Sequence, residues 1–342
     1  MAYQYVCYSI SFWMDTKGNA FSLDENRKKK IIVLSPDEAG YSDIFSVKGL
    51  IMAASILRDK KLEQETKVYY ETVLNCIRNN RFRTDQENLN PKNNEVFVEG
   101  KSSHAPKMIA IGMCTLFYEL YHNTQYINDG FDLINDIFSE YVNYDNKFQS
   151  YQKYDMPEFI NSESAPYTDE GHVISIPGHI MELVGFVGKF FHAIEKDPKL
   201  SEKQKADINK INSMLTSFFI HNFRLGFKMG YGMYNSVSLD TRKPINSDMP
   251  WWSLPETIRA AAYTYRIASE DQKKDIMSIL ADTSNVFLKR YINDKVYCMA
   301  YQTLDEFGSP IHMVPATPDA DPGYHTGLSI IDFMNIWSDL LE

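Results

Sequence analysis

The residues best suited to proton transfer lie in residues 176–183, which read Ile-Pro-Gly-His-Ile-Met-Glu-Leu. Pro177 and Gly178 are poor helix-interior residues, so they predict that a helix starts here. His179 and Glu182 are three residues apart and therefore share one face of the first turn. Because the helix N-terminus disfavours an imidazolium, we expect His179 to be neutral near pH 7 and able to transfer protons. The alternative is a surface histidine with Glu182 capping the helix.

Two aromatic clusters precede other predicted helices. Trp251 and Trp252 are followed by Glu256. Indole rings stack on the C–H faces of sugars and a carboxylate accepts hydroxyl hydrogen bonds, so this pairing favours a carbohydrate pocket. Two core tryptophans at a helix start are the alternative. The other cluster is Tyr324-His325, where a lone histidine is more often structural.

Two polar residues mark further helix starts. Asp43 fits an N-terminal cap or a first-turn acid, and His104 fits a neighbour of a cap. Neither residue identifies a chemistry by itself. They are of interest because His179, Trp252 and His325 also lie at helix starts.

The elements that must position these residues are paired helices. The predicted helices come in pairs, so consecutive helices are expected to pack as antiparallel hairpins. The helices are predicted at residues 40–58, 62–79, 103–122, 127–141, from 177 onward, 200–223, 250–268, 272–291 and 323–342.

A strand-and-turn unit recurs before three of these helices. Each copy has aromatic-rich strand residues, a turn around an aspartate and then an aromatic residue at a helix start. A repeat of helical hairpins with such insertions predicts a ring in which alternate helices line the inside. The helix starts would then converge on one concave site. The copies are residues 13–18, 237–242 and 302–308.

Composition restricts the class of protein further. The chain has 342 residues, is 44% hydrophobic and shows no break in composition, so we expect one domain over residues 1–342. Its net charge of −10 argues against nucleic acid or an anionic membrane as the main partner. We find no signal peptide or bilayer-spanning run. The scattered cysteines suggest neither disulfides nor zinc and fit a cytoplasmic protein; they are Cys7, Cys76, Cys114 and Cys298.

Several motifs together resemble the N-acylglucosamine 2-epimerase family. Residues 177–182 resemble its PGH-x-x-E helix start, and residues 251–256 resemble its WW-x-x-x-E motif. Tyr324-His325 resembles the aromatic-His pair of its last helix. Residues 42–45 and 105–108 look like its S-E-x-F and V-P-M-M segments, in family order.

The resemblance implies an all-α fold, the (α/α)6 barrel, which is a toroid of helical hairpins with short β-hairpin insertions. It also implies a sugar epimerase or aldose–ketose isomerase that needs no cofactor or metal. His179 and His325 would be its acid/base pair, with Glu182 supporting the site. We assign substrate binding to Trp251, Trp252, Glu256, Asp43 and Tyr324.

The chain departs from the family pattern in three places. His325 is followed by Thr326-Gly327-Leu328, where the family has an arginine, and Leu254 replaces a polar residue. The chain also begins in what looks like the first strand-turn insertion of the family, so the first few helices are expected to be missing. Apolar helix faces would then be uncovered, and a homodimer would cover them.

The function predicted from these residues is a sugar 2-epimerase of the N-acylglucosamine/N-acylmannosamine type. One histidine would remove the proton at C2 to give an enediol, and the other would return a proton to the opposite face. The alternatives are an aldose–ketose isomerase of the same fold, a non-catalytic sugar-binding relative, and a glycoside hydrolase. The hydrolase would use a carboxylate pair drawn from Asp43, Glu182, Asp248 and Glu256.

Overall fold

The computed structural model describes residues 13–14, 20–23, 29–31, 38–82, 100–293, 299–311 and 324–341. Residues 15–18 of the first strand-and-turn copy lie outside this part of the chain, as do Cys7 and Cys298.

The described chain is mostly α-helical, and its helices match the predicted ones to within a few residues. The last predicted helix is divided, because a π-helical turn, η2 (Tyr324–Leu328), precedes α10; another, η1 (Phe287–Tyr291), follows α9. The α-helices are α2 (Tyr41–Leu57), α3 (Lys60–Arg78), α4 (Ala105–Tyr121), α5 (Thr124–Glu140), α6 (Pro177–Ile194), α7 (Glu202–Gly226), α8 (Ser253–Ile267), α9 (Glu270–Val286) and α10 (Ser329–Leu341).

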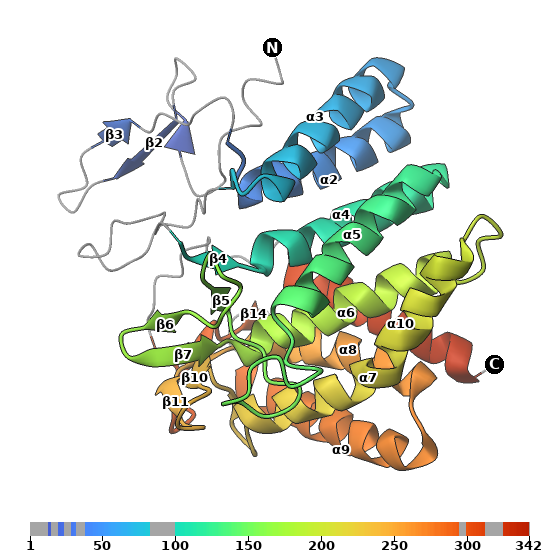
Figure 1. Cartoon of the computed structure of the whole chain (residues 1–342). Helices are drawn as coiled ribbons and strands as arrows, with labels where there is room; N and C mark the ends of the chain where they lie inside the picture. Colours follow the sequence, from blue (N-terminus) through green and yellow to red (C-terminus); the bar gives the residue numbers. More distant parts are fainter. Residues whose placement is uncertain are drawn as a thin grey trace.

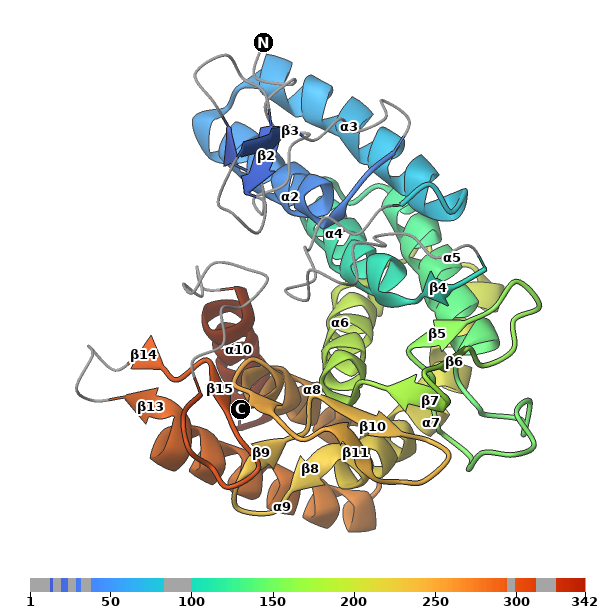
Figure 2. The ribbon, with the colours of Figure 1, turned by 90° about the vertical axis from the view of Figure 1, so that its left-hand side faces the viewer.

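The helices form an inner and an outer layer (Figure 2). In the inner layer α2 packs on α4, α4 on α6, α6 on α8, and α8 on α10. Helices α3, α5, α7 and α9 lie outside, each against the inner helix that precedes it. Because α6 has neighbours on both sides and behind it, nearly all of its residues are buried, as expected for a helix that is apolar on every face.

Short antiparallel strands gather at one end of the helices (Figure 1). A four-stranded sheet has the order β11-β10-β7-β6, with Val237 opposite Ser175. Strands β4, β7 and β12 lead directly into α4, α6 and α8, so the inner helices start at this end, which we call the mouth. The strands of the main sheet are β6 (Thr168–Asp169), β7 (His172–Ser175), β10 (Ser236–Ser238) and β11 (Pro244–Asn246).

The remaining strands form two- and three-stranded antiparallel sheets. They are β1 (Trp13–Met14), β2 (Ala20–Leu23), β3 (Lys29–Ile31), β4 (Ser102–Ser103), β5 (Phe159–Ile160), β8 (Phe227–Lys228), β9 (Gly232–Met233), β12 (Met249–Pro250), β13 (Ile292–Asn293), β14 (Met299–Ala300) and β15 (Thr303–Leu304).

The inner and outer helices begin differently. Each outer helix has an N-cap side chain that accepts a backbone hydrogen bond, namely Asp59, Asn123, Ser201 and Ser269. Among the described inner helices, α4, α6 and α8 have no such bond, and their N-cap residues are His104, Ile176 and Trp252. The inner helix starts therefore hold residues that do not serve as caps.

Helices α2 and α10 are the two ends of the inner row (Figure 2). Both expose large apolar side chains. On α2 these are Met52, Ile56 and Leu57, and on η2 and α10 they are Leu328, Ile331, Met334, Leu340 and Leu341.

Candidate active site

His179 is held by a carboxylate that sequence reasoning missed. The residue lies in the first turn of α6, and its Nδ1 is 3.0 Å from Oε2 of Glu158, which is buried in the connection between α5 and α6. The same carboxylate contacts Nε2 of His104 at 3.2 Å and accepts a hydrogen bond from Ser103 Oγ. Since a carboxylate accepts the Nδ1 proton, the neutral imidazole presents a lone pair on Nε2.

His325 is also held at Nδ1 by a buried carboxylate, that of Glu256. Its Nδ1 is 3.0 Å from Oε1 of the fully buried Glu256, which also accepts a hydrogen bond from Ser329 Oγ. Arg259 donates to the other oxygen of Glu256. Within the described part of the chain, neither His179 Nε2 nor His325 Nε2 has a hydrogen-bond partner. Both atoms are therefore available to a ligand.

The ring of Trp252 contacts both histidines. Its ring centroid is 5.4 Å from that of His179 and 5.3 Å from that of His325, with the planes inclined by 32° and 35°. The two imidazoles are thus separated by no more than the sum of these distances. A Cβ added at Gly178 would lie 2.6 Å from Cη2 of Trp252, so the glycine allows the indole to approach the start of α6.

Glu182 faces the His325 side of the site. The sequence places it beside His179, but its Oε1 accepts a hydrogen bond from the Tyr324 hydroxyl at 3.0 Å. The Tyr324 ring packs against His325 and against Phe45 of α2, at centroid distances of 4.6 Å and 4.8 Å. The carboxylate that supports His179 by a hydrogen bond is therefore Glu158 and not Glu182.

The charges around His179 act against the effect expected from the helix N-terminus. Burial disfavours the imidazolium, but the charge and hydrogen bond of Glu158 together with the charge of Glu182 outweigh burial and raise the pKa of His179. In return, although burial opposes it, His179 and His104 lower the pKa of Glu158. Glu158 is therefore an anion at neutral pH.

The pKa of Glu158 is lowered, whereas that of Glu182 is raised. Burial and the neighbouring Glu256 charge raise its pKa, against the effects of His325, His179 and Arg259. Burial also raises the pKa of Tyr324 well above its usual value, so this hydroxyl keeps its proton and donates to Glu182. The neighbouring Glu256 contacts Arg259, His325 and Ser329.

Lys48 of α2 also faces this network. Its Nζ lies 5.0 Å from the Tyr324 ring centroid and also over the rings of Phe45 and Phe186. In the described residues, its ammonium has neither a hydrogen bond nor an ion pair. Burial, followed by the charges of Arg259 and Lys189, lowers its pKa to about 8.

Two of the residues expected to bind substrate lie in the wall of the site. Trp251 is buried in an apolar cluster with Met249 and Leu304, and its Nε1 donates to Thr326 Oγ1 at 3.3 Å. Asp43 accepts the Gly40 backbone N–H at 2.6 Å and the Tyr69 hydroxyl, so it ties the start of α2 to α3. These contacts match the structural alternatives for both residues.

Two clusters have the composition of metal sites. His104, Glu158 and His179 form one cluster, and Glu182, Glu256 and His325 form the other, with potential ligand atoms within 4.8 Å of one another. The imidazole-to-carboxylate distances in them are those of hydrogen bonds. A metal ion would have to replace these hydrogen bonds.

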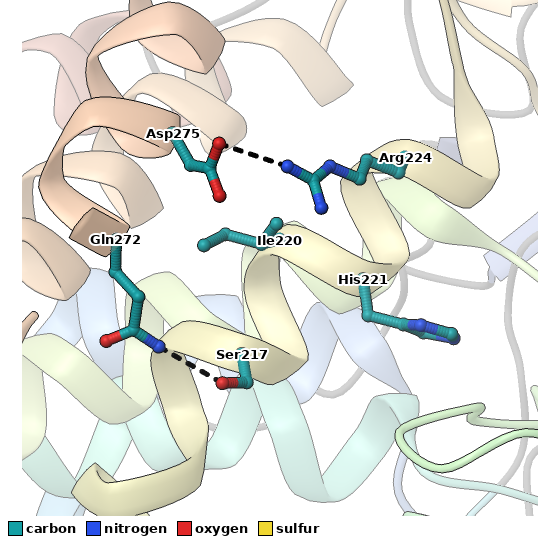
Figure 3. A pocket seen from close by; sticks show the side chains of 6 residues that line it. All are labelled: Ser217, Ile220, His221, Arg224, Gln272 and Asp275. Atoms are coloured by element: carbon teal, nitrogen blue, oxygen red, sulfur yellow. Dashed lines mark hydrogen bonds and ion pairs between the residues drawn. The ribbon is translucent and has the colours of Figure 1, made fainter. Parts of the chain in front are cut away.

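A separate pocket of about 290 Å³ lies between outer helices α7 and α9 (Figure 3). Its polar side chains are engaged with one another: Arg224 pairs with Asp275 at 3.1 Å, and Gln272 donates to Ser217. The pocket contains none of the clustered histidines and carboxylates of the mouth, so we assign it no role.

Solved structures with the same fold are sugar-converting enzymes. A cellobiose 2-epimerase from Bacillus thermoamylovorans superposes with a TM-score of 0.64 at 13% identity, covering 86% of this chain and 71% of that chain. A sugar epimerase from a ruminal bacterium gives 0.63 at 13% identity, with the same coverage of both chains. A D-mannose isomerase gives 0.62 at 12% identity, again covering 86% and 71%. These similarities establish the (α/α)6 barrel fold.

Family assignment comes from the sequence model of N-acylglucosamine 2-epimerase (GlcNAc 2-epimerase), which matches residues 15–326. The chain belongs to this family and is a carbohydrate epimerase of the isomerase class. A comparison with curated proteins finds no match. No helix among the described residues is long and apolar enough to cross a membrane.

Proposed function

We propose that this protein is a sugar 2-epimerase of the N-acylglucosamine/N-acylmannosamine type, with His179 and His325 as its two bases. The supporting observation is that both histidines pack against the same ring, that of Trp252, and are held in the same way. Each imidazole is held at Nδ1 by a buried carboxylate and leaves Nε2 without a partner among the described residues.

In the proposed reaction the sugar is in its open-chain form, with C2 between the two Nε2 atoms. One imidazole takes the C2 proton, the electrons of that C–H bond form a C1–C2 double bond, and the carbonyl electrons move onto the C1 oxygen. The product is an enolate that keeps the acylamino group at C2. The opposite imidazole then returns a proton to the other face of C2. Each carboxylate stabilises the imidazolium formed beside it, and the raised pKa of His179 favours its uptake of a proton.

The other residues have supporting roles in this proposal. Trp252 offers an indole face to the C–H side of the sugar, and Glu158 and Glu256 fix the tautomers of the bases. Glu182 and Tyr324 lie next to His325, where the raised pKa of Glu182 suits a hydrogen bond to a sugar oxygen.

The family name supports an N-acylated hexosamine as substrate, and the structural relatives suggest cellobiose and mannose as competitors. An aldose–ketose isomerase would share the first step but would return the proton to C1. Two similarly held bases favour return to C2 from the opposite face. The carboxylate-pair alternative is less favoured, because Glu256 already binds Arg259, Ser329 and His325.

The test is incubation of the protein in D2O with N-acetylglucosamine, N-acetylmannosamine, cellobiose, glucose and mannose, followed by proton NMR. We expect deuterium at C2 and formation of the epimer with the N-acetyl sugars. His179→Asn and His325→Asn should each lose net epimerisation but exchange deuterium into one epimer, with opposite preferences. His192→Asn is the matched control, because His192 contacts Glu195 on the same helix, outside the site.

Other products would contradict the proposed reaction and indicate a different one. A ketose would indicate the isomerase reaction, and release of reducing ends from cellobiose would indicate hydrolysis. If neither histidine variant changed C2 exchange, the two-base mechanism would be wrong.

A further inference from the structure

His104 is a buried imidazole that the proposed reaction does not use. It lies directly before α4, is fully buried, and makes no cap hydrogen bond with its side chain. The backbone N–H of Ala105, the first residue of α4, donates instead to Ser103 Oγ at 3.1 Å. An imidazole is costly to bury without a polar partner, and capping does not explain why it is buried here.

His104 shares an acceptor oxygen with His179. Oε2 of Glu158 is 3.2 Å from Nε2 of His104 and 3.0 Å from Nδ1 of His179, and the two rings lie edge to face with their centroids 6.2 Å apart. An ionised carboxylate only accepts, so both nitrogens donate to it. The other oxygen, Oε1, accepts from Ser103. Three donors therefore hold the carboxylate, and two of them share one oxygen.

The surroundings of His104 indicate which of its nitrogens carries the proton. Its Nδ1 is buried and has no hydrogen-bond partner among the described residues. A second proton, on Nδ1, would be an unpaired N–H in the interior, so the geometry favours the neutral tautomer with its proton on Nε2. The neighbouring ring of Tyr141 lies edge to face at 5.5 Å, and its hydroxyl shares a hydrogen bond with Ser102 Oγ. Burial raises the pKa of Tyr141, so this ring adds no charge.

We propose that His104 is a positioning residue for His179. Its Nε2–H holds Oε2 of Glu158 in place and draws part of the carboxylate charge away from the imidazole of His179. The orientation of His179 and its affinity for a proton are then both set from a fully buried position outside the reacting groups. The effect on His179 is independent of any reaction, whereas its importance for catalysis rests on the proposed function.

The sign of the effect is opposite to that of removing Glu158. The charges acting on His179 are those of Glu158 and Glu182. Without the Nε2–H of His104, the Glu158 carboxylate has one donor fewer and attracts the imidazolium of His179 more strongly, so the pKa of His179 should rise further. A general loosening of the site would instead admit water and move this pKa back toward its usual value. The direction of the change therefore separates the two roles.

The test compares His104→Gln with His104→Met, two side chains of similar size. The amide nitrogen of glutamine can donate in place of Nε2, whereas methionine has no donor. NMR titration of the full chain with labelled imidazole rings follows His179 directly and without any sugar, and the spectrum of His179→Asn identifies its signal. We expect His104→Gln to keep the wild-type pKa of His179 and His104→Met to raise it by about 0.5 pH units or more. His192→Gln is the control, because His192 contacts Glu195 outside the site.

Two further measurements complete the test. Nitrogen shifts of the wild-type chain should show the Nε2–H tautomer of His104, and this measurement needs no variant. In D2O the acidic limb of the pH profile of C2 exchange should move to higher pH in His104→Met and stay in place in His104→Gln. Thermal unfolding of each variant checks that it folds.

The outcomes separate this proposal from the proposed function. A pKa of His179 that is unchanged or lower in His104→Met overturns the positioning role, as does a proton on Nδ1 of His104 at neutral pH. If the titrations follow the prediction but the wild-type chain exchanges no deuterium at C2, the effect on His179 stands and the proposed function fails.

Discussion

Replacement of Lys48 by methionine should stabilise the protein at neutral pH. The ammonium is half-buried beside Tyr324, Phe45 and Phe186, and burial together with Arg259 and Lys189 lowers its pKa from 10.5 to about 8. Glu182 and Glu256 act in the opposite direction but do not compensate. A fall of this size corresponds to an unfavourable free energy of about 3 kcal/mol for the charged form, and partial exposure makes this an upper limit.

The sign of the effect follows from proton linkage. Because the pKa in the folded state is lower than in the unfolded state, the unfolded chain binds more protons between pH 8 and pH 10.5. Wild-type stability therefore rises over this range relative to Lys48→Met, which lacks the titrating group. The advantage of the methionine variant is largest at pH 8 and below, and it decreases as the pH rises.

Urea unfolding measured at every pH unit from 6 to 10 gives the difference in free energy of unfolding between Lys48→Met and wild type, and the change of that difference with pH. Experiments at two protein concentrations separate unfolding from association. Lys210→Met on the exposed side of α7 is the control and should change the free energy of unfolding by less than about 0.5 kcal/mol. If Lys48→Met were less stable than wild type below pH 8, the ammonium would have a stabilising interaction and our reasoning would be refuted.

Two further substitutions test the histidine site. Glu158→Gln removes the charge that raises the pKa of His179, so the acidic limb of the pH–rate profile should move to lower pH and the rate should fall roughly 10²-fold. The exposed Glu163→Gln should change neither the profile nor the rate. An unshifted profile in Glu158→Gln would contradict the role of Glu158. Gly178→Ala places a Cβ against Trp252 and should cost about 1–3 kcal/mol of stability by thermal unfolding, whereas a neutral effect would show that the indole moves freely.

The sequence predicted the order and type of the helices because their signals are local. Pro177 and Gly178 mark the start of α6, and Ser201 and Ser269 occupy the N-caps of α7 and α9. The repeat of hairpins predicted the alternation of inner and outer helices. His179, Trp252 and His325 could be placed at one end of the ring, since each lies at an inner helix start.

The hydrogen-bond partners of these residues could not be predicted in the same way. Glu158 lies 21 residues before His179 in an irregular connection, with no periodic pattern to indicate where its side chain points. Glu182 is on the expected helix face, but which neighbour it contacts depends on Tyr324, 142 residues away. The orientation of the Trp251 side chain depends on packing against β15, which contributes Leu304 to the same apolar cluster. Such contacts are set by tertiary packing and not by spacing.

The different starts of the two helix layers bear on how this fold can change its specificity. On the outer helices, replacing Asp59, Asn123, Ser201 or Ser269 would lose a cap worth about 1 kcal/mol. No cap bond of this kind is lost at His104, Ile176 or Trp252, the corresponding positions of inner helices α4, α6 and α8. Evolution can therefore vary the residues that line the mouth while the outer layer preserves the scaffold.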